Sequence, residues 1–222
     1  MTTLPLVFKD GHLFVELDEN LWLFDSGAPT SFGAGTSIEI AGEQFRVAKS
    51  YFGLSEATLS SFVGVPCAGL LGADVLGHFD HLLDAAGGTL TISKTELQHG
   101  GQAVRLSEFM GIPMLKAQIA DAEYRMFFDT GAQISYFQES LISQFPPAGT
   151  ITDFYLGIGQ FESETYHVPL TLSSIAFTVR CGTLPGLLGM TLAMAGTQGL
   201  IGNEILLNRT VGFFPRRSAL YM

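Results

Sequence analysis

The sequence predicts an all-β protein made of two similar, β-barrel-like lobes related by a pseudo-twofold axis, with a cleft between them. An apolar run that ends in Asp-Ser/Thr-Gly-Ala occurs twice, at Leu23–Ala28 and at Phe127–Ala132, 104 positions apart. A second motif, two aliphatic residues, a glycine and another aliphatic pair, follows each copy, at Gly69–Leu76 and Gly199–Leu206. The repeated order of two motifs indicates two diverged copies of one unit, each of about a hundred residues.

Composition and charge indicate which kinds of partner and which cellular location to expect. A hydrophobic content of 47% suits a globular protein with a large core, and a net charge of −10 argues against nucleic acid or an anionic membrane as partner. The amino terminus lacks the basic start and long apolar core of a secretory signal, so we expect a cytoplasmic protein. The charge-free run Cys181–Asn203 contains Pro185 and frequent glycines, which does not favour a membrane span. We expect Cys67 and Cys181 to be ordinary buried thiols.

The first unit begins with three predicted strands. Apolar and polar residues alternate around Asp10–Gly11, which predicts a hairpin turn, and Asp18–Asn20 predicts a second turn. The apolar run Leu21–Phe24 is typical of a strand buried on both faces. This strand is expected to carry Asp25 at its end, at the mouth of a loop.

The remainder of the first unit is predicted to contain two hairpins and a short helix. A hairpin is expected at Ser37–Ala48, a strand through Leu70–Leu71 and a short helix near Ala73–Gly77. A closing hairpin turns at Asp84–Gly88.

The second unit is predicted to repeat this order. Leu170–Cys181 matches the first unit's hairpin, and Gly202–Met222 matches its closing segment. We therefore assign residues 1–93 to an N-terminal lobe and residues 112–222 to a C-terminal lobe. The polar stretch between them, residues 94–111, is expected to be a linker.

One long insertion distinguishes the second unit. It has Gln138–Pro169 at the place where the first unit has only Gly33–Ser37. Within the insertion we expect a short helix near its start and then a hairpin. The centre of that hairpin, Gly157, Ile158 and Gly159, is predicted to be a mobile tip.

Asp25 and Asp129 are the candidate catalytic residues. Carboxylates delivered by equivalent turns of two equivalent lobes would meet at the pseudo-twofold axis, where they cannot both ionise. The pair would share one proton and titrate as a unit. The ionised member can take a proton from water while the protonated member polarises a substrate carbonyl. This hydrolysis requires no covalent intermediate, no metal and no other cofactor.

The residues beside each aspartate fit this chemistry. Ser26 and Thr130 offer hydroxyls that can tie the two loops together across the axis. Gly27 and Gly131 would let backbone N–H groups approach the carboxylates, which a Cβ atom would hinder.

Gly72 and Gly202 are predicted to have a structural role. Each follows two bulky aliphatic residues and would let a neighbouring strand pack closely beneath an aspartate loop.

Two other interpretations compete with the catalytic one. Asp-Ser-Gly and Asp-Thr-Gly are good turn sequences, so both aspartates could simply cap turns. Two histidines and two aspartates near position 80 could suggest a metal site, but a third clear ligand group is missing and we expect no metal. The histidines and aspartates concerned are His78, Asp80, His81 and Asp84.

The paired motifs resemble those of the aspartic peptidases, both the two-lobed pepsin-like enzymes and the dimeric retropepsins. The motif pairs are Leu23–Gly27 with Leu70–Gly72, and Phe127–Gly131 with Leu200–Gly202. The resemblance covers nearly the whole chain and implies a compact, single-chain form of the pepsin-like fold with a catalytic cleft between lobes. It implies that Asp25 and Asp129 form the catalytic pair. It also implies an extended polypeptide substrate that pairs with a flap.

Several positions depart from that family. Ala28 and Ala132 follow the glycines, as in retropepsins, where pepsin-like enzymes often have a hydroxyl. Fewer hydrogen bonds to the carboxylates predict activity at mildly acidic to near-neutral pH. Ala73 and Asn203 stand where retropepsins have an arginine, so the ion pairs that brace the lobes in that family have no counterpart at these positions.

The flap is predicted on the second lobe, whereas pepsin-like enzymes carry it on the first. We place it at Asp153–His167, with Tyr155 over the cleft; an ordinary strand tyrosine is the alternative for Tyr155. The competing flap is the first-unit hairpin at Ile38–Arg46.

Together these features predict a monomeric aspartic endopeptidase that acts on polypeptides, with apolar side chains favoured beside the scissile bond. The alternative is a peptide-binding module that keeps the fold and cleft without hydrolysing its ligand, because a fold alone does not fix function.

Overall fold

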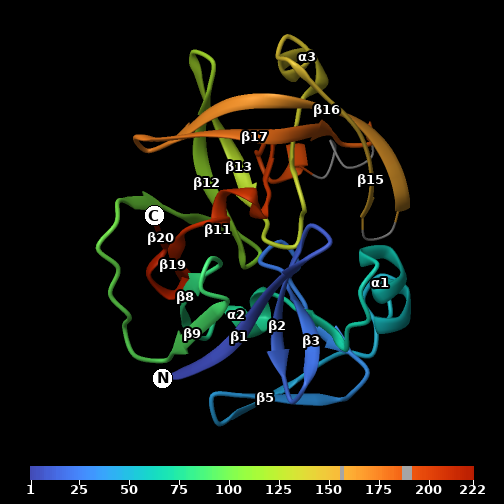
Figure 1. The fold of residues 1–222 in the computed structure, drawn as a ribbon, viewed down its shortest axis with the longest axis vertical. Coiled ribbons are helices and arrows are strands. Elements are labelled where there is room, and N and C mark those ends of the chain that lie inside the picture. The colour runs from blue at the N-terminus through green and yellow to red at the C-terminus, as the bar shows by residue number, and fades with distance from the viewer. Residues whose placement is uncertain (156–157, 187–191) are drawn as a thin grey trace.

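The computed structural model describes residues 1–155, 158–186 and 192–222, and most of these residues lie in β-strands. The prediction of an all-β protein is confirmed. A ten-stranded sheet and an eight-stranded sheet make up most of the molecule, and a small two-stranded sheet lies beside the first. Figure 1 shows the eight-stranded sheet at the top and the first part of the ten-stranded sheet below it.

The ten-stranded sheet contains every long strand of the first half of the chain. In spatial order its strands are β10 (Ala103–Arg105), β20 (Ala219–Tyr221), β19 (Thr210–Phe214), β8 (Asp80–Asp84), β9 (Thr89–Ser93), β1 (Thr2–Lys9), β2 (His12–Leu17), β3 (Asn20–Phe24), β7 (Gly69–Leu71) and β4 (Phe32–Gly33).

The eight-stranded sheet is built from strands that lie between residues 107 and 201. Its order is β11 (Ser107–Phe109), β12 (Ile112–Ile119), β13 (Ala122–Phe128), β18 (Gly199–Ile201), β14 (Ser135–Phe137), β17 (Ile175–Thr183), β16 (Gly159–Leu172) and β15 (Pro147–Tyr155). The two-stranded sheet is β5 (Ser37–Ile40) with β6 (Glu43–Arg46).

Helices in the described residues are short. They are α1 (Glu56–Val63), α2 (Ala73–Leu76) and α3 (Glu139–Ile142), with 3-10 helices η1 (Asn203–Leu206) and η2 (Pro215–Arg217). Ser55 caps α1 by accepting a hydrogen bond from the Thr58 N–H. None of the described helices is long and apolar enough to cross a membrane.

The duplication predicted from the motifs appears in the strand pairing. β3 pairs in parallel with β7, and β13 pairs in parallel with β18, so each aspartate motif lies beside its own second motif. β4 and β14 then pair antiparallel with β7 and β18 in the two halves. Both halves therefore hold the strand that ends in an aspartate in the same local arrangement.

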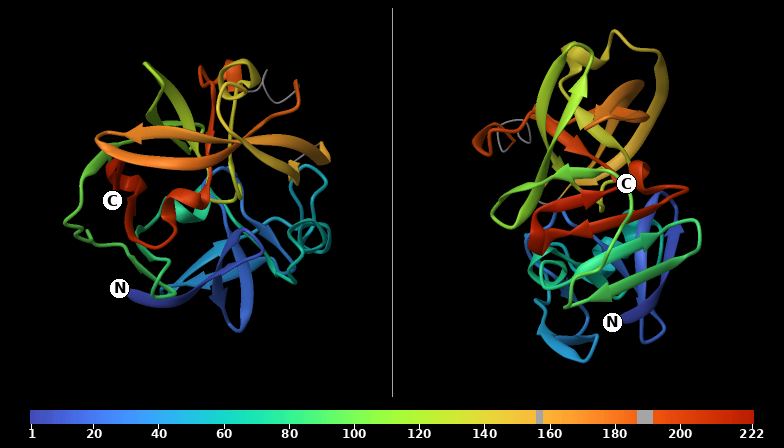
Figure 2. Two further views of the ribbon diagram at one scale, coloured as in Figure 1. Left: turned by 45° about the horizontal axis from the view of Figure 1, so that its top comes forward. Right: turned by 90° about the vertical axis from the view of Figure 1, so that its left-hand side faces the viewer.

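The strands at the end of the chain differ from the expected division of the sequence. β19 pairs with β8, and β20 and β10 extend this side of the first lobe's sheet. Figure 2 shows these strands between the two lobes. The linker expected at residues 94–111 contains β10 and β11, and part of the expected C-terminal lobe, 112–222, completes a sheet with the first. The reason is burial, since Val104, Leu106 and Leu220 lie in the core.

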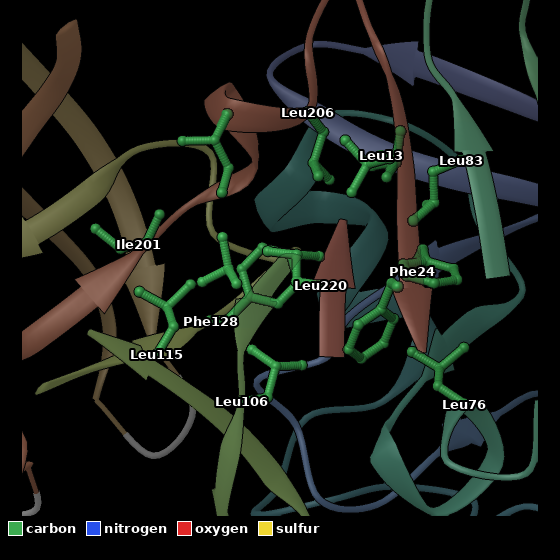
Figure 3. Close-up of a cluster of buried hydrophobic side chains, with 14 of the residues drawn as sticks. Leu13, Phe24, Leu76, Leu83, Leu106, Leu115, Phe128, Ile201, Leu206 and Leu220 are labelled. Carbon is green, nitrogen blue, oxygen red and sulfur yellow. The ribbon is translucent and has the colours of Figure 1, made fainter. Parts of the chain in front are cut away.

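A single core joins the strand ends that carry the two aspartates. Phe24 and Phe128, which directly precede the aspartates, belong to the cluster drawn in Figure 3. Ring contacts connect them through His81 and Phe213, with centroid distances of 5.4 Å, 5.5 Å and 5.6 Å along the series. Full burial of one phenylalanine side chain contributes about 1.5–3 kcal/mol to stability. The core thus fixes both strand ends relative to one another.

The insertion in the second half forms α3 and the long hairpin of β15 and β16. The two strands pair antiparallel from Pro147–Tyr166 to Tyr155–Gly159, and Figure 1 shows the hairpin extending down beside α1 of the first lobe. The first-unit hairpin, β5–β6, lies elsewhere. It packs Phe45 against Phe79 with a centroid distance of 5.7 Å, inside the first lobe's core.

Candidate active site

Asp25 and Asp129 lie at equivalent strand ends. The Asp25 N–H donates to the Leu71 carbonyl at 3.0 Å, and the Asp129 N–H donates to the Ile201 carbonyl at 2.9 Å. Each bond continues the parallel pairing of the aspartate strand with the strand of the second motif. A rigid sheet therefore sets the direction from which each carboxyl enters the site.

Ser26 and Thr130 lock the two aspartate loops together by reciprocal hydrogen bonds. The Ser26 hydroxyl donates to the Phe128 carbonyl at 2.8 Å and accepts from the Thr130 N–H at 3.1 Å. The Thr130 hydroxyl donates to the Phe24 carbonyl at 2.8 Å and accepts from the Ser26 N–H at 2.9 Å. Four bonds across the axis hold the loops in one relative position. We call this arrangement the loop lock.

Backbone N–H groups orient each carboxyl. Asp25 Oδ1 accepts from the N–H groups of Gly27 at 2.8 Å and Ala28 at 2.9 Å. Asp129 Oδ1 accepts from the loop's glycine N–H at 3.0 Å and from the following alanine N–H at 3.2 Å. The two carboxyls lie close enough that a hydrogen bond between them contributes to the pKa shift of each.

Gly27 and Gly131 permit this close approach. A Cβ atom on Gly27 would collide with the carboxyl of Asp129, and one on Gly131 would collide with the carboxyl of Asp25. Each loop therefore packs directly on the carboxyl of the other lobe.

Burial raises the pKa of both carboxyls. Burial, then the charge of Asp129, raises the pKa of Asp25 well above its usual value. Burial also raises the pKa of Asp129, while hydrogen bonds from Asp25 and from the backbone N–H groups oppose the increase. The pair is therefore expected to hold one proton at a pH where two ordinary aspartates would both be ionised. The two groups titrate as a pair.

Gly72 and Gly202 support the loops from below. Their N–H groups donate to the hydroxyls of Ser31 at 2.8 Å and Ser135 at 3.1 Å. A Cβ on Gly72 would lie 2.7 Å from the Ala28 carbonyl oxygen, which confirms a close backbone approach. No role was predicted for Ser31 and Ser135, although a serine at the same place in both copies of the motif was a signal that could have found them.

Two neutral side chains, Asn203 and His12, contact the backbone of the opposite lobe. The Asn203 amide donates to the Gly11 carbonyl at 2.9 Å, and His12 Nδ1 lies 3.2 Å from the carbonyl oxygen of Gly131. Burial lowers the pKa of His12, which keeps the imidazole neutral. His12 was not predicted, because a single histidine at a strand start carries no sequence signal.

One cavity lies over both aspartates, with a volume of about 60 Å³, enough for several water molecules. The two aspartate loops form its floor. Asp153, Phe154 and Tyr155 of β15, with Phe161 of β16, line its other side. The β15–β16 hairpin therefore covers the dyad, and the residues of β5–β6 do not line this cavity.

Tyr155 lines the cavity over the dyad. Burial raises the pKa of Tyr155 to about 12, and repulsion by the charges of Asp129 and Asp25 adds to the increase. Ile158 and Gly159 form the turn after Tyr155 and are not among the described residues that line the cavity. Gly157 lies outside the described residues.

The side chains considered for a metal site have other partners. His81 Nε2 lies 2.8 Å from the Leu76 carbonyl oxygen, and Asp80 forms a 2.6 Å ion pair with Arg217. Among the residues described, no group of three or more His, Cys, Asp or Glu side chains could hold a metal ion.

Comparisons with known proteins give little beyond this geometry. No protein-family model matches the chain, and no curated protein matches it. One match among solved structures is the solution structure of the Simian Foamy Virus (mac) protease, at 18% identity and a TM-score of 0.27. The match covers 32% of this chain and 78% of that one. A likeness of this size carries no conclusion about activity.

Proposed function

We propose that the chain is an aspartic endopeptidase that hydrolyses peptide bonds with water activated by Asp25 and Asp129. The loop lock carries the proposal, because it holds two carboxyls in hydrogen-bond contact on the floor of one cavity. Turn-capping aspartates need only their own loop. Here each carboxyl is in contact with the loop of the other lobe as well.

The geometry supports a balanced acid–base mechanism. The ionised carboxyl of the Asp25–Asp129 pair accepts a proton from a water whose oxygen bonds to the peptide carbonyl carbon, while the protonated carboxyl gives its proton to the carbonyl oxygen. The resulting diol collapses when the amide nitrogen takes the proton from the first carboxyl and a diol hydroxyl returns one to the second. The C–N bond breaks, and a carboxylic acid and an amine leave.

The substrate that fits this site is an extended polypeptide held beneath the β15–β16 hairpin. Its backbone can pair with a strand edge, and the cavity wall offers apolar surface from Phe154, Phe161 and Leu200. We further propose that the chain works as a monomer in the cytoplasm, without nucleic acid or a membrane as partner. Both aspartates of the pair are in the same chain.

Replacement of either carboxyl tests the proposal. We expect the wild type to cleave members of an unbiased peptide library, with an optimum at mildly acidic to near-neutral pH. Asp25→Asn and Asp129→Asn should each lower kcat/KM by at least about 10²-fold, the smaller effect typical of positioned acid–base groups. Mass spectrometry of the digests across a pH series makes this measurement.

Asp121→Asn is the matched control, because Asp121 is an exposed turn residue outside the site. It should cleave like the wild type. The proposal fails if the wild type cuts no peptide at any pH, or if both dyad variants remain active. Binding of a statine-type peptide without cleavage would instead establish the peptide-binding alternative.

A further inference from the structure

A third carboxyl faces the cavity above the dyad. Asp153 of β15 is 7% exposed and lines the cavity that Asp25 and Asp129 share. Its Oδ2 accepts from the Tyr136 hydroxyl at 2.5 Å, and its Oδ1 accepts from the Phe154 N–H at 2.8 Å. The mechanism proposed above does not use this carboxyl.

The hydrogen bonds and neighbours of Asp153 leave a negative charge without a counter-ion. Both of its hydrogen-bond partners are donors, so the carboxyl acts as an acceptor on both oxygens. Across residues 1–155, 158–186 and 192–222, no Lys, Arg or His forms a salt bridge with it. The charge of Asp153 acts on His12, but burial lowers the pKa of that imidazole and keeps it neutral. A buried carboxylate is costly unless a cation pairs with it, so a cationic ligand would be favoured at this place.

The surroundings of Asp153 have the shape that a long cationic side chain needs. The wall beside it is apolar and consists of Tyr136, Phe161, Leu184 and Leu200. An aliphatic stem can lie along such a wall while its charged end reaches a carboxylate. The Gln133 side-chain amide, in the loop that follows Asp129, donates to the carbonyl of Thr152 at 3.4 Å, which places Asp153 on the Asp129 side of the dyad.

We propose that Asp153 selects a lysine or arginine side chain of the substrate, in a subsite beside Asp129. This inference rests on the proposed function, because the preference is measured as a ratio of cleavage rates. The sequence predicted a preference for apolar side chains beside the scissile bond. The inference changes this prediction for one subsite, which has apolar walls and the Asp153 carboxylate at its end.

The test uses N-acetylated, C-amidated peptides that differ at one position, with lysine or norleucine there and the position varied along the peptide. Norleucine keeps the aliphatic stem and lacks the charge. We expect kcat/KM of the wild type to favour lysine at least tenfold at one position. Asp153→Asn should reduce that ratio at least tenfold, because its amide can still accept from Tyr136 but carries no charge.

Glu162→Gln is the control, because Glu162 is an exposed carboxylate on the same hairpin. Its lysine-to-norleucine ratio should equal that of the wild type. The inference is overturned if the wild type shows no lysine preference at any position, or if Asp153→Asn keeps it. A wild type without a lysine preference rejects the inference whether or not the variant folds. If only peptides with a free amino terminus bind better, the cation is the terminal ammonium and the inference is likewise overturned.

A binding measurement separates this inference from the proposed function. Calorimetry compares statine-type peptides that carry lysine or norleucine at the selected position, with wild type and Asp153→Asn. At least tenfold tighter lysine binding that the variant loses supports the subsite even if no peptide is cleaved. Equal binding together with efficient cleavage would retain the peptidase and reject the subsite.

Discussion

At the scale of single residues, the loop lock depends on two small hydroxyl side chains. Ser26 and Thr130 are buried, and each makes one donor and one acceptor bond to the opposite loop. A buried N–H or C=O left unpaired costs about 1–3 kcal/mol, more than the bond itself contributes. The lock therefore positions the dyad and also stabilises the fold.

Removal of these hydroxyls should weaken both properties. We expect Ser26→Ala and Thr130→Val each to lower the free energy of unfolding by about 1–3 kcal/mol. We also expect kcat to fall more than KM rises, since the carboxyls lose their fixed spacing. Urea unfolding and steady-state kinetics measure the two effects. Ser107→Ala, at an exposed strand position, is the control and should change stability by less than about 0.5 kcal/mol. Wild-type stability in both lock variants would contradict this role.

At the scale of elements, the β15–β16 hairpin is the asymmetric addition to an otherwise duplicated fold. It contributes Asp153 and Tyr155 to the cavity. It is also in contact with the first lobe, because Phe154 packs on Phe62 of α1 with ring centroids 5.2 Å apart. We expect this aromatic contact to stabilise the closed position of the hairpin.

Loss of the aromatic contact should favour the open hairpin. An aromatic pair contributes about 0.5–1.5 kcal/mol, so Phe62→Ala should speed amide exchange in β15 by roughly two- to tenfold. Hydrogen exchange followed by mass spectrometry gives the rate. Phe52→Ala is the control, because Phe52 is a large exposed aromatic of the same lobe that makes its ring contact with Tyr51 instead. Unchanged exchange in the Phe62 variant would show that other contacts hold the hairpin closed.

At the scale of the whole molecule, local patterns predicted more than long-range pairing did. The turn at Asp10–Gly11, the strand before Asp25 and the helix at Ala73 follow from nearest neighbours in the chain, and all three are present. The positions of β10 and β19 were harder to predict, because a sequence pattern that indicates a strand does not show which sheet the strand joins. Asp153 was unpredictable as a site residue for the same reason: only the folded hairpin brings it over the dyad.

The central claim about the whole molecule is that its two halves bring Asp25 and Asp129 together so that they share a proton. The most direct measurement is the titration of their side-chain carboxyl carbons by NMR in the wild type, assigned with Asp25→Asn and Asp129→Asn. Burial raises both pKa values, so we expect the pair to keep one proton up to a pH well above the pKa of an ordinary aspartate. The remaining aspartate in either variant should titrate differently from the same residue in the pair. Two carboxyls that titrate independently at ordinary values would contradict the shared-proton dyad.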